Sequence, residues 1–130
     1  MNNIIRTYLE RKLKALDEKK DNDIIAIKTT DVNYATLRNL KKTDKKCEGL
    51  ITLGEFKFSG AIKDQINEVR KAYNADVKAL YALCEEADAL LDTFGYSYDR
   101  TDANATKTYK AMLKLLKDFD IVKRDGTINA

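Results

Sequence analysis

The strongest pattern along the chain is a row of apolar side chains in residues 60–94. Its members step by three or four positions, from Ile62 through Val77 to Phe94. This spacing is typical of one face of an α-helix, and Ser59 stands where an N-cap residue is expected. At 1.5 Å per residue such a helix would be about 50 Å long. Its apolar row therefore needs cover along a considerable length.

Weaker helical patterns occur on both sides of this row. Apolar residues at helical spacing predict further helices over residues 3–20, 31–42 and 103–119. Thr30 or Asp31 could cap the second of these ranges, and Thr101 or Asp102 the last. Because the connections are short, neighbouring helices are expected to be antiparallel. The row in residues 60–94 would then face the two outer helices, 3–20 and 103–119.

Three short segments favour extended structure. The β-branched run at residues 24–27 is typical of a buried strand, and residues 49–58 alternate apolar and charged side chains between glycines. Asp125-Gly126, between residues 121–122 and 127–128, is a hairpin signal. We therefore expect a mainly α fold with a minor β part. It would be an antiparallel helical bundle around one long central helix, with a few short strands and a C-terminal hairpin, in a single helical domain over residues 1–130.

The composition argues against the common catalytic arrangements. The 130 residues include no histidine, proline or tryptophan, and 35% of them are charged. Without histidine the commonest general base and metal ligand is missing. The glycines also show no phosphate-binding spacing. We therefore expect a protein that is not an enzyme and that has no cofactor and no metal.

Two cysteines, Cys47 and Cys84, form neither a disulfide framework nor a zinc motif. Cys84 lies on the apolar row, so it is expected to be a buried thiol. The first residues show no apolar signal region, and no stretch approaches the length of a membrane span. These observations favour a cytoplasmic protein that does not enter a membrane.

Acidic residues cluster near the end of the long predicted helix. Glu85, Asp88 and Asp92 share one helix face, and Glu86 lies beside them. Such a group favours a solvated or lysine-paired face over a site for a divalent cation, since the loop of the known calcium motifs is absent.

Charge divides the chain into three parts. Residues 1–58 carry 13 basic and 9 acidic groups, residues 59–102 carry 5 and 9, and residues 103–130 carry 6 and 3. An acidic centre is thus flanked by two basic ends, which could attract each other or present separate faces to partners.

A turn of tyrosine and arginine residues follows the long predicted helix. Tyr96, Tyr98 and Arg100 are of the residue types that dominate protein-binding hot spots. The alternative is that both tyrosines cap the end of the apolar core.

Basic residues form a stripe near the C-terminus. Lys107, Lys110, Lys114 and Lys117 step by three or four positions, and Lys123 and Arg124 follow them. Such a stripe could contact phosphate groups, or it could be an ordinary solvated face.

Residues 106–128 (TKTYKAMLKLLKDFDIVKRDGTI) resemble the end of a winged helix-turn-helix domain. The resemblance implies DNA binding, with Lys107, Thr108 and Lys110 at recognition-helix positions and residues 121–126 opening the wing. In that family a short helix and a tight turn precede the recognition helix, whereas here a long helix and an eight-residue loop do.

Two functional hypotheses follow. The first is a non-catalytic protein-interaction module that binds a protein partner or itself, as a homodimer, through the long helix and the Tyr96–Arg100 turn. Lysine outnumbers arginine 18 to 6, a bias associated with AT-rich genomes, which favours a bacterial or phage accessory factor. The second is a nucleic-acid-binding protein that uses the lysine stripe and the C-terminal hairpin.

Overall fold

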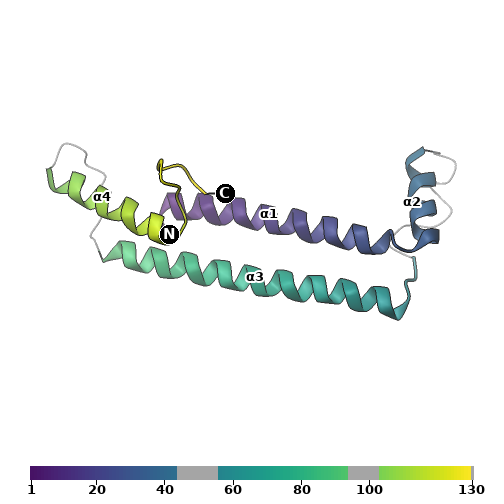
Figure 1. Cartoon of the computed structure of the whole chain (residues 1–130). Helices are drawn as coiled ribbons and strands as arrows, with labels where there is room; N and C mark the ends of the chain where they lie inside the picture. The colour runs from purple at the N-terminus through teal and green to yellow at the C-terminus, as the bar shows by residue number, and fades with distance from the viewer. Residues whose placement is uncertain (44–55, 94–102, 130) are drawn as a thin grey trace. The chain divides into compact units, whose positions relative to one another are not determined.

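The protein is mainly helical (Figure 1). The computed structural model describes residues 1–43, 56–93 and 103–129, and within these ranges it contains four helices and no strand. The helices are α1 (Asn3–Lys28), α2 (Val32–Thr43), α3 (Gly60–Asp92) and α4 (Ala103–Asp118). The chain forms two compact units, one of Met1–Leu16 with Ala75–Ala130 and one of Asp17–Asn74. Helices α1 and α3 each contribute a segment to both units.

The three later helices agree with the sequence pattern to within about two residues at each end. Asp31 caps α2, because its carboxylate accepts hydrogen bonds from the backbone N–H groups of Asn33 and Tyr34 at 2.9 and 3.2 Å. The Ser59 hydroxyl accepts one from the N–H of Ile62 at 3.4 Å, which confirms the cap expected for α3. The residues expected to cap α4 lie outside the described residues.

The strand predicted at residues 24–27 is wrong, because α1 continues through it to Lys28. Burial along this run follows a helix, with Ile24 buried, Ile25 and Ile27 half-buried and Ala26 exposed. No glycine or proline interrupts the polar residues that precede the run, so the helical hydrogen bonds continue through them. The helix ends where the Thr29 and Thr30 hydroxyls donate to carbonyl groups of its last turn.

The extended segment predicted for residues 49–58 lies mostly outside the described residues. Its last three residues, 56–58, belong to no helix or strand. They lead directly to the Ser59 cap of α3.

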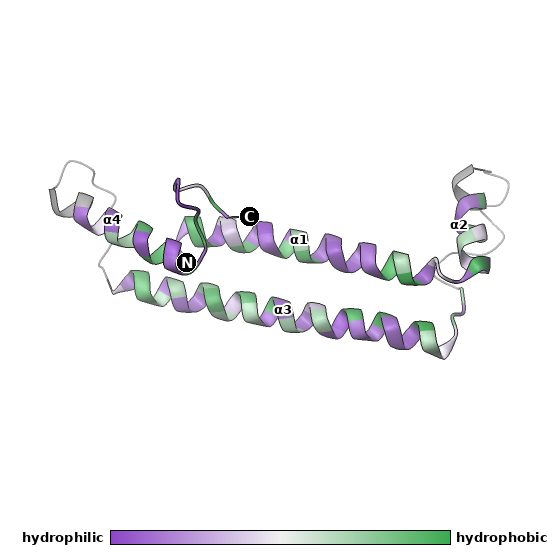
Figure 2. Ribbon diagram, viewed as in Figure 1, coloured by the Kyte–Doolittle hydropathy of each residue, from purple (hydrophilic) through white to green (hydrophobic). Residues whose placement is uncertain are grey.

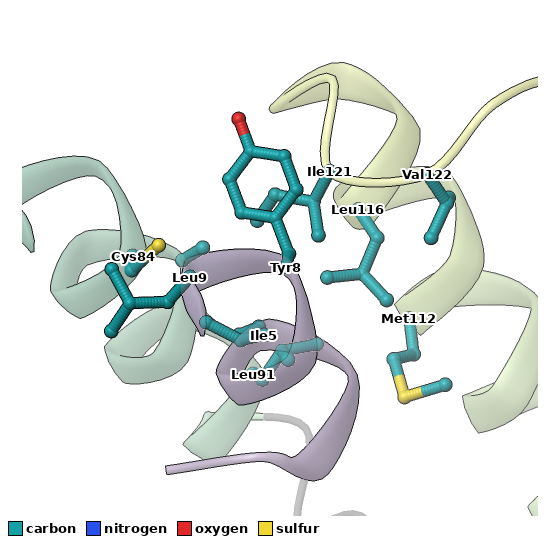
Figure 3. Packing of buried hydrophobic residues seen from close by; sticks show 10 residues of the cluster. Ile5, Tyr8, Leu9, Cys84, Leu91, Met112, Leu116, Ile121 and Val122 are labelled. Atoms are coloured by element: carbon teal, nitrogen blue, oxygen red, sulfur yellow. The ribbon is translucent and has the colours of Figure 1, made fainter. Parts of the chain in front are cut away.

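The first unit has a core built from four stretches of chain (Figure 3). Its buried members are Ile5, Tyr8 and Leu9 of α1, Cys84, Ala87 and Leu91 of α3, Met112 and Leu116 of α4, and Ile121 and Val122 after it. The Asn2 backbone N–H donates to the Asp88 carboxylate at 2.7 Å, so within this unit the start of α1 lies beside the end of α3.

Tyr109 and Leu113 belong to the apolar residues at helical spacing that predict the helix over 103–119, and both are less buried than this pattern predicts. Leu113 is half-buried, and Tyr109 is 39% exposed. Tyr109 lies nearly one turn ahead of Met112, where the buried cluster begins on this helix. Among the residues of α4 whose burial is described, the core of the first unit therefore holds side chains only from Met112 onward.

The second unit combines the later part of α1, α2 and the first part of α3. Tyr73 donates a hydrogen bond to the Asp17 carboxylate at 2.5 Å, and the Lys20 ammonium lies 4.3 Å from the centre of the Tyr73 ring. At the other end of the unit Lys28 lies over the ring of Phe58. These pairs show that the two helix segments are antiparallel within this unit.

The apolar row of α3 is covered throughout its described length. Each member is buried or half-buried: Ile62, Ile66, Val69, Tyr73, Val77, Leu80, Cys84, Ala87 and Leu91. In Figure 2 the apolar positions of α3 recur at intervals along the helix. Helix α1 has 26 residues, where 18 were predicted from the pattern.

The C-terminal hairpin is reduced to one isolated antiparallel bridge between Val122 and Ile128. The Gly126 N–H donates to the Lys123 carbonyl at 2.9 Å, and Gly126 has a φ of 85°. Arg124 and Asp125 are thus the central residues of the turn, and Gly126 follows in the left-handed conformation. The predicted turn is therefore displaced by one residue.

Candidate functional site

The lysine stripe of α4 lies on the side of the helix that faces away from the core. Met112 and Leu116 are fully buried. The four lysines are all exposed: Lys107, Lys110, Lys114 and Lys117. At about 100° per residue they span an arc of about 80°, roughly opposite the two buried side chains. The lysines therefore share one exposed face of the helix, which is about 15 Å long from the first lysine to the last.

The end of α4 carries two further cations onto the surface. Asp120 takes a left-handed conformation with a φ of 57°, and the N–H groups of Ile121 and Val122 both donate to the Leu116 carbonyl. This reversal buries the side chains of residues 121 and 122 in the core. Lys123 and Arg124 come next and are exposed. We call these six cations, four on α4 and two on the turn, the basic face.

The basic face has little neutralising charge of its own. Within the part of the chain that is described, none of its six cations has a carboxylate oxygen within ion-pair distance. Between residues 107 and 124 the sequence contains only two acids, Asp118 and Asp120. Asp125 lies next to the face: the hydroxyl and amide of Thr127 donate to its carboxylate and lower its pKa, and the nearby charge of Lys123 lowers this pKa further. The face is therefore suited to contact an external anion.

The turn expected to bind a protein partner, with Tyr96, Tyr98 and Arg100, lies outside the described residues. The last turn of α3, a few residues ahead of it, contains Leu90, which is 39% exposed. A large apolar side chain is therefore exposed to solvent close in sequence to this turn.

The acidic cluster of α3 does not form a metal-binding group. Asp88 accepts the hydrogen bond of Asn2 and lies 3.9 Å from the amino group of Met1. Glu85, Glu86 and Asp92 are exposed. Among the residues that the structure describes, no three Cys, Asp or Glu side chains come together in a way that could hold a metal ion.

Cys84 has the buried position that the sequence predicted. Its side chain is fully buried in the core of the first unit, and this burial raises the pKa of the thiol. Cys47 lies outside the described residues. Cys84 thus acts as a small apolar core residue.

The second unit contains a surface hollow that the sequence patterns did not reveal. It joins Lys28 of α1, the phenylalanines Phe56 and Phe58, and Lys63 and Arg70 of α3. These residues come from three separate stretches of the chain. The alternation of aromatic and basic residues in Phe56-Lys57-Phe58 is the one local signal that could have indicated it.

Comparison of the chain with protein-family models, with curated proteins and with solved structures gives no match. In the described ranges, no helix combines the length and the apolar character that crossing a membrane requires.

Proposed function

We propose that this is a non-catalytic protein that binds nucleic acid through its basic face. The observation that supports this function is the set of six exposed cations, on α4 and the following turn, that form no salt bridge with a carboxylate among the described residues. Phosphate contacts of this kind release counterions, so the binding would be sensitive to salt and largely independent of base sequence. The same segment carries the resemblance to the end of a winged helix-turn-helix domain.

A salt titration tests this function directly. Binding of a fluorescein-labelled 20-base-pair duplex would be followed by fluorescence anisotropy at several salt concentrations. If four to six cations contact phosphates, a plot of log K against log salt should have a slope between roughly −3.6 and −5.4. Absence of binding even at low salt would contradict the proposal.

Two matched variants separate the basic face from general charge. The site variant changes three lysines of α4 to glutamine: Lys107, Lys110 and Lys114. The control variant does the same at three exposed lysines of α1 and α3: Lys14, Lys19 and Lys78. The net charge changes equally in both. The site variant should flatten the slope by about 2.7, and the control should leave it nearly unchanged. Equal losses in the two variants would show that the basic face has no special role.

A protein-interaction module is the second candidate function. It is favoured by the exposure of Leu90, at 39%, a few positions ahead of the Tyr96–Arg100 turn in the sequence, because apolar, tyrosine and arginine side chains are of the types found in binding hot spots. The partner would be another protein or a second copy of the chain. The apolar row of α3 is buried or half-buried along its described length, so we do not propose it as the contact surface.

Sedimentation and affinity capture test this second function. A monomer at high micromolar concentration would exclude the homodimer. Capture of the same partners by the wild type and by a Tyr98→Ala, Arg100→Ala variant would exclude the turn as the binding site. A Leu90→Ala variant would test the neighbouring apolar side chain in the same way.

A further inference from the structure

The hollow in the second unit combines apolar, aromatic and cationic side chains on one surface. It has a volume of about 340 Å³ and is lined by Lys28, Phe56, Phe58, Lys63, Ile66 and Arg70, with Asn67 beside them. Its size is in the range of small-ligand sites. All of these residues belong to the second unit, whereas the basic face on α4 belongs to the first.

The aromatic wall of the hollow is held by a cluster of three rings. The ring centres of Phe56 and Phe58 lie 4.9 Å apart, and both pack against Tyr34 at 5.4 and 5.0 Å. Tyr34 is only 5% exposed, whereas both phenylalanines keep part of their surface open. Tilted and edge contacts at these distances are favourable, so the two open rings form a fixed apolar surface.

Three cations line the hollow together with the two phenylalanine rings. Lys63 and Arg70 are seven residues apart on α3, which puts them on one face of the helix with Ile66 buried between them. The Lys28 ammonium comes from α1 and lies 5.7 Å from the centre of the Phe58 ring. The lining contains no carboxylate, and among the described residues none of these cations has an ion-pair partner.

We infer that this hollow binds a nucleotide. The planar base would pack against Phe56 and Phe58, since aromatic rings hold bases with little regard to their identity. The phosphate would contact Lys63 and Arg70, whose guanidinium group can donate two parallel hydrogen bonds to phosphate oxygens. The Asn67 amide lies beside Arg70 and offers a donor and an acceptor to the sugar or the base.

A phosphate ester fits the hollow better than a peptide carboxylate. Three cations line it and no carboxylate does, and a terminal phosphate carries close to two negative charges where a carboxylate carries one. The nucleotide could be free or could be part of a single strand. Binding of a single strand here would rest on the proposed nucleic-acid function, whereas binding of a free nucleotide would not.

An NMR titration of the full chain with AMP is the first test. Amide shifts in residues 56–58 and 63–70 should move on addition of AMP. Adenosine and inorganic phosphate, which each offer half of the ligand, should bind at least about tenfold more weakly. If AMP leaves these amides unmoved, a titration with the oligonucleotide dT10 must move them instead. Failure of both titrations would overturn the inference, as would an acidic, phenylalanine-containing peptide that binds more tightly than either.

Variants of the hollow complete the test. A Lys63→Gln, Arg70→Gln variant should weaken AMP binding about tenfold or more, because it removes both phosphate contacts. Both residues are exposed, so the change removes no buried packing. A Phe58→Leu variant keeps an apolar side chain but loses the ring, and it should weaken binding as well. The control is a Lys19→Gln, Lys78→Gln variant with the same change in charge. Equal affinities of the site and control variants would overturn the assignment.

The variants of the two surfaces also separate this inference from the proposed function. Loss of duplex binding in the Lys107, Lys110, Lys114 variant, with AMP binding unchanged, would support both. If the wild type binds AMP but does not bind the duplex, the proposed function of the basic face is refuted and the nucleotide site is still supported.

Discussion

Replacement of Leu116 by alanine should strongly destabilise the first unit. This side chain is fully buried in the core that joins the start of α1, the end of α3 and α4. In Figure 3 it points from α4 toward the side chains around Ile5 and Tyr8. The backbone carbonyl of the same residue accepts the two hydrogen bonds that turn the chain after α4. Its position thus couples the core to the reversal that follows.

The magnitude follows from the atoms removed. Leucine loses three carbon atoms on change to alanine, and each buried methylene contributes about 0.8 kcal/mol, which gives about 2.4 kcal/mol. The cavity that remains adds to this cost, so a total of about 3–4 kcal/mol is expected. For a domain whose whole stability is about 5–15 kcal/mol, such a loss is severe.

Urea denaturation followed by far-ultraviolet circular dichroism measures this loss. Leu113→Ala is the matched control, because it removes the same atoms from the same helix at a half-buried position outside the buried cluster. We expect the control to lose about 1 kcal/mol, well under half of the loss at residue 116. Equal losses for the two variants would show that α4 is not held by this core, and the reasoning would be refuted.

Three further predictions concern local contacts. The Tyr73 hydroxyl is the main cause of the lowered pKa of Asp17, so Tyr73→Phe should raise that pKa toward its ordinary value in an NMR titration. Because the pKa of Asp17 is lowered in the folded protein, its contribution to the free energy of unfolding is complete above the ordinary aspartate pKa and is lost as the pH falls through the lowered pKa. The Tyr73→Phe variant should therefore lose less stability than the wild type when the pH is lowered. Gly126→Ala should reduce the thermal stability by about 1 kcal/mol, because φ is 85° there, and an unchanged melting temperature would contradict this strain. In a Cys47→Ser background the Cys84 thiol should react slowly with a disulfide reagent in the folded protein and rapidly in urea; fast reaction without urea would contradict its burial.

The sequence pattern predicted the long helix well, because its spacing persists over many turns and a serine precedes it. It failed at residues 24–27, where three isoleucines around Ala26 have the β-branched character of a strand. Intrinsic preference is weak over four residues, and burial of Ile24 within the second unit favours continuation of α1. The polar residues before this run break the apolar spacing, but they are the solvated surface of the same helix.

The candidate sites differ in how far the sequence could reveal them. The stripe on α4 lies within one helix, so its spacing alone placed Lys107 to Lys117 on one exposed face. The hollow depends on Lys28, Phe58 and Arg70, which are spread over 42 positions of the chain and belong to different elements. Such a site becomes visible only once the helices are packed, because periodicity reports on one element at a time.

The division of the chain into two units has a consequence for the order of folding. The second unit is one continuous stretch, Asp17–Asn74, so its contacts close short loops. The first unit joins residues that are far apart, as in the bond between Asn2 and Asp88 across 86 positions. Contacts of high sequence separation form slowly, because the entropy of loop closure must be overcome first. During synthesis the N-terminal turns of α1 must therefore wait, with Ile5 and Leu9 uncovered, until α4 has emerged to complete their core.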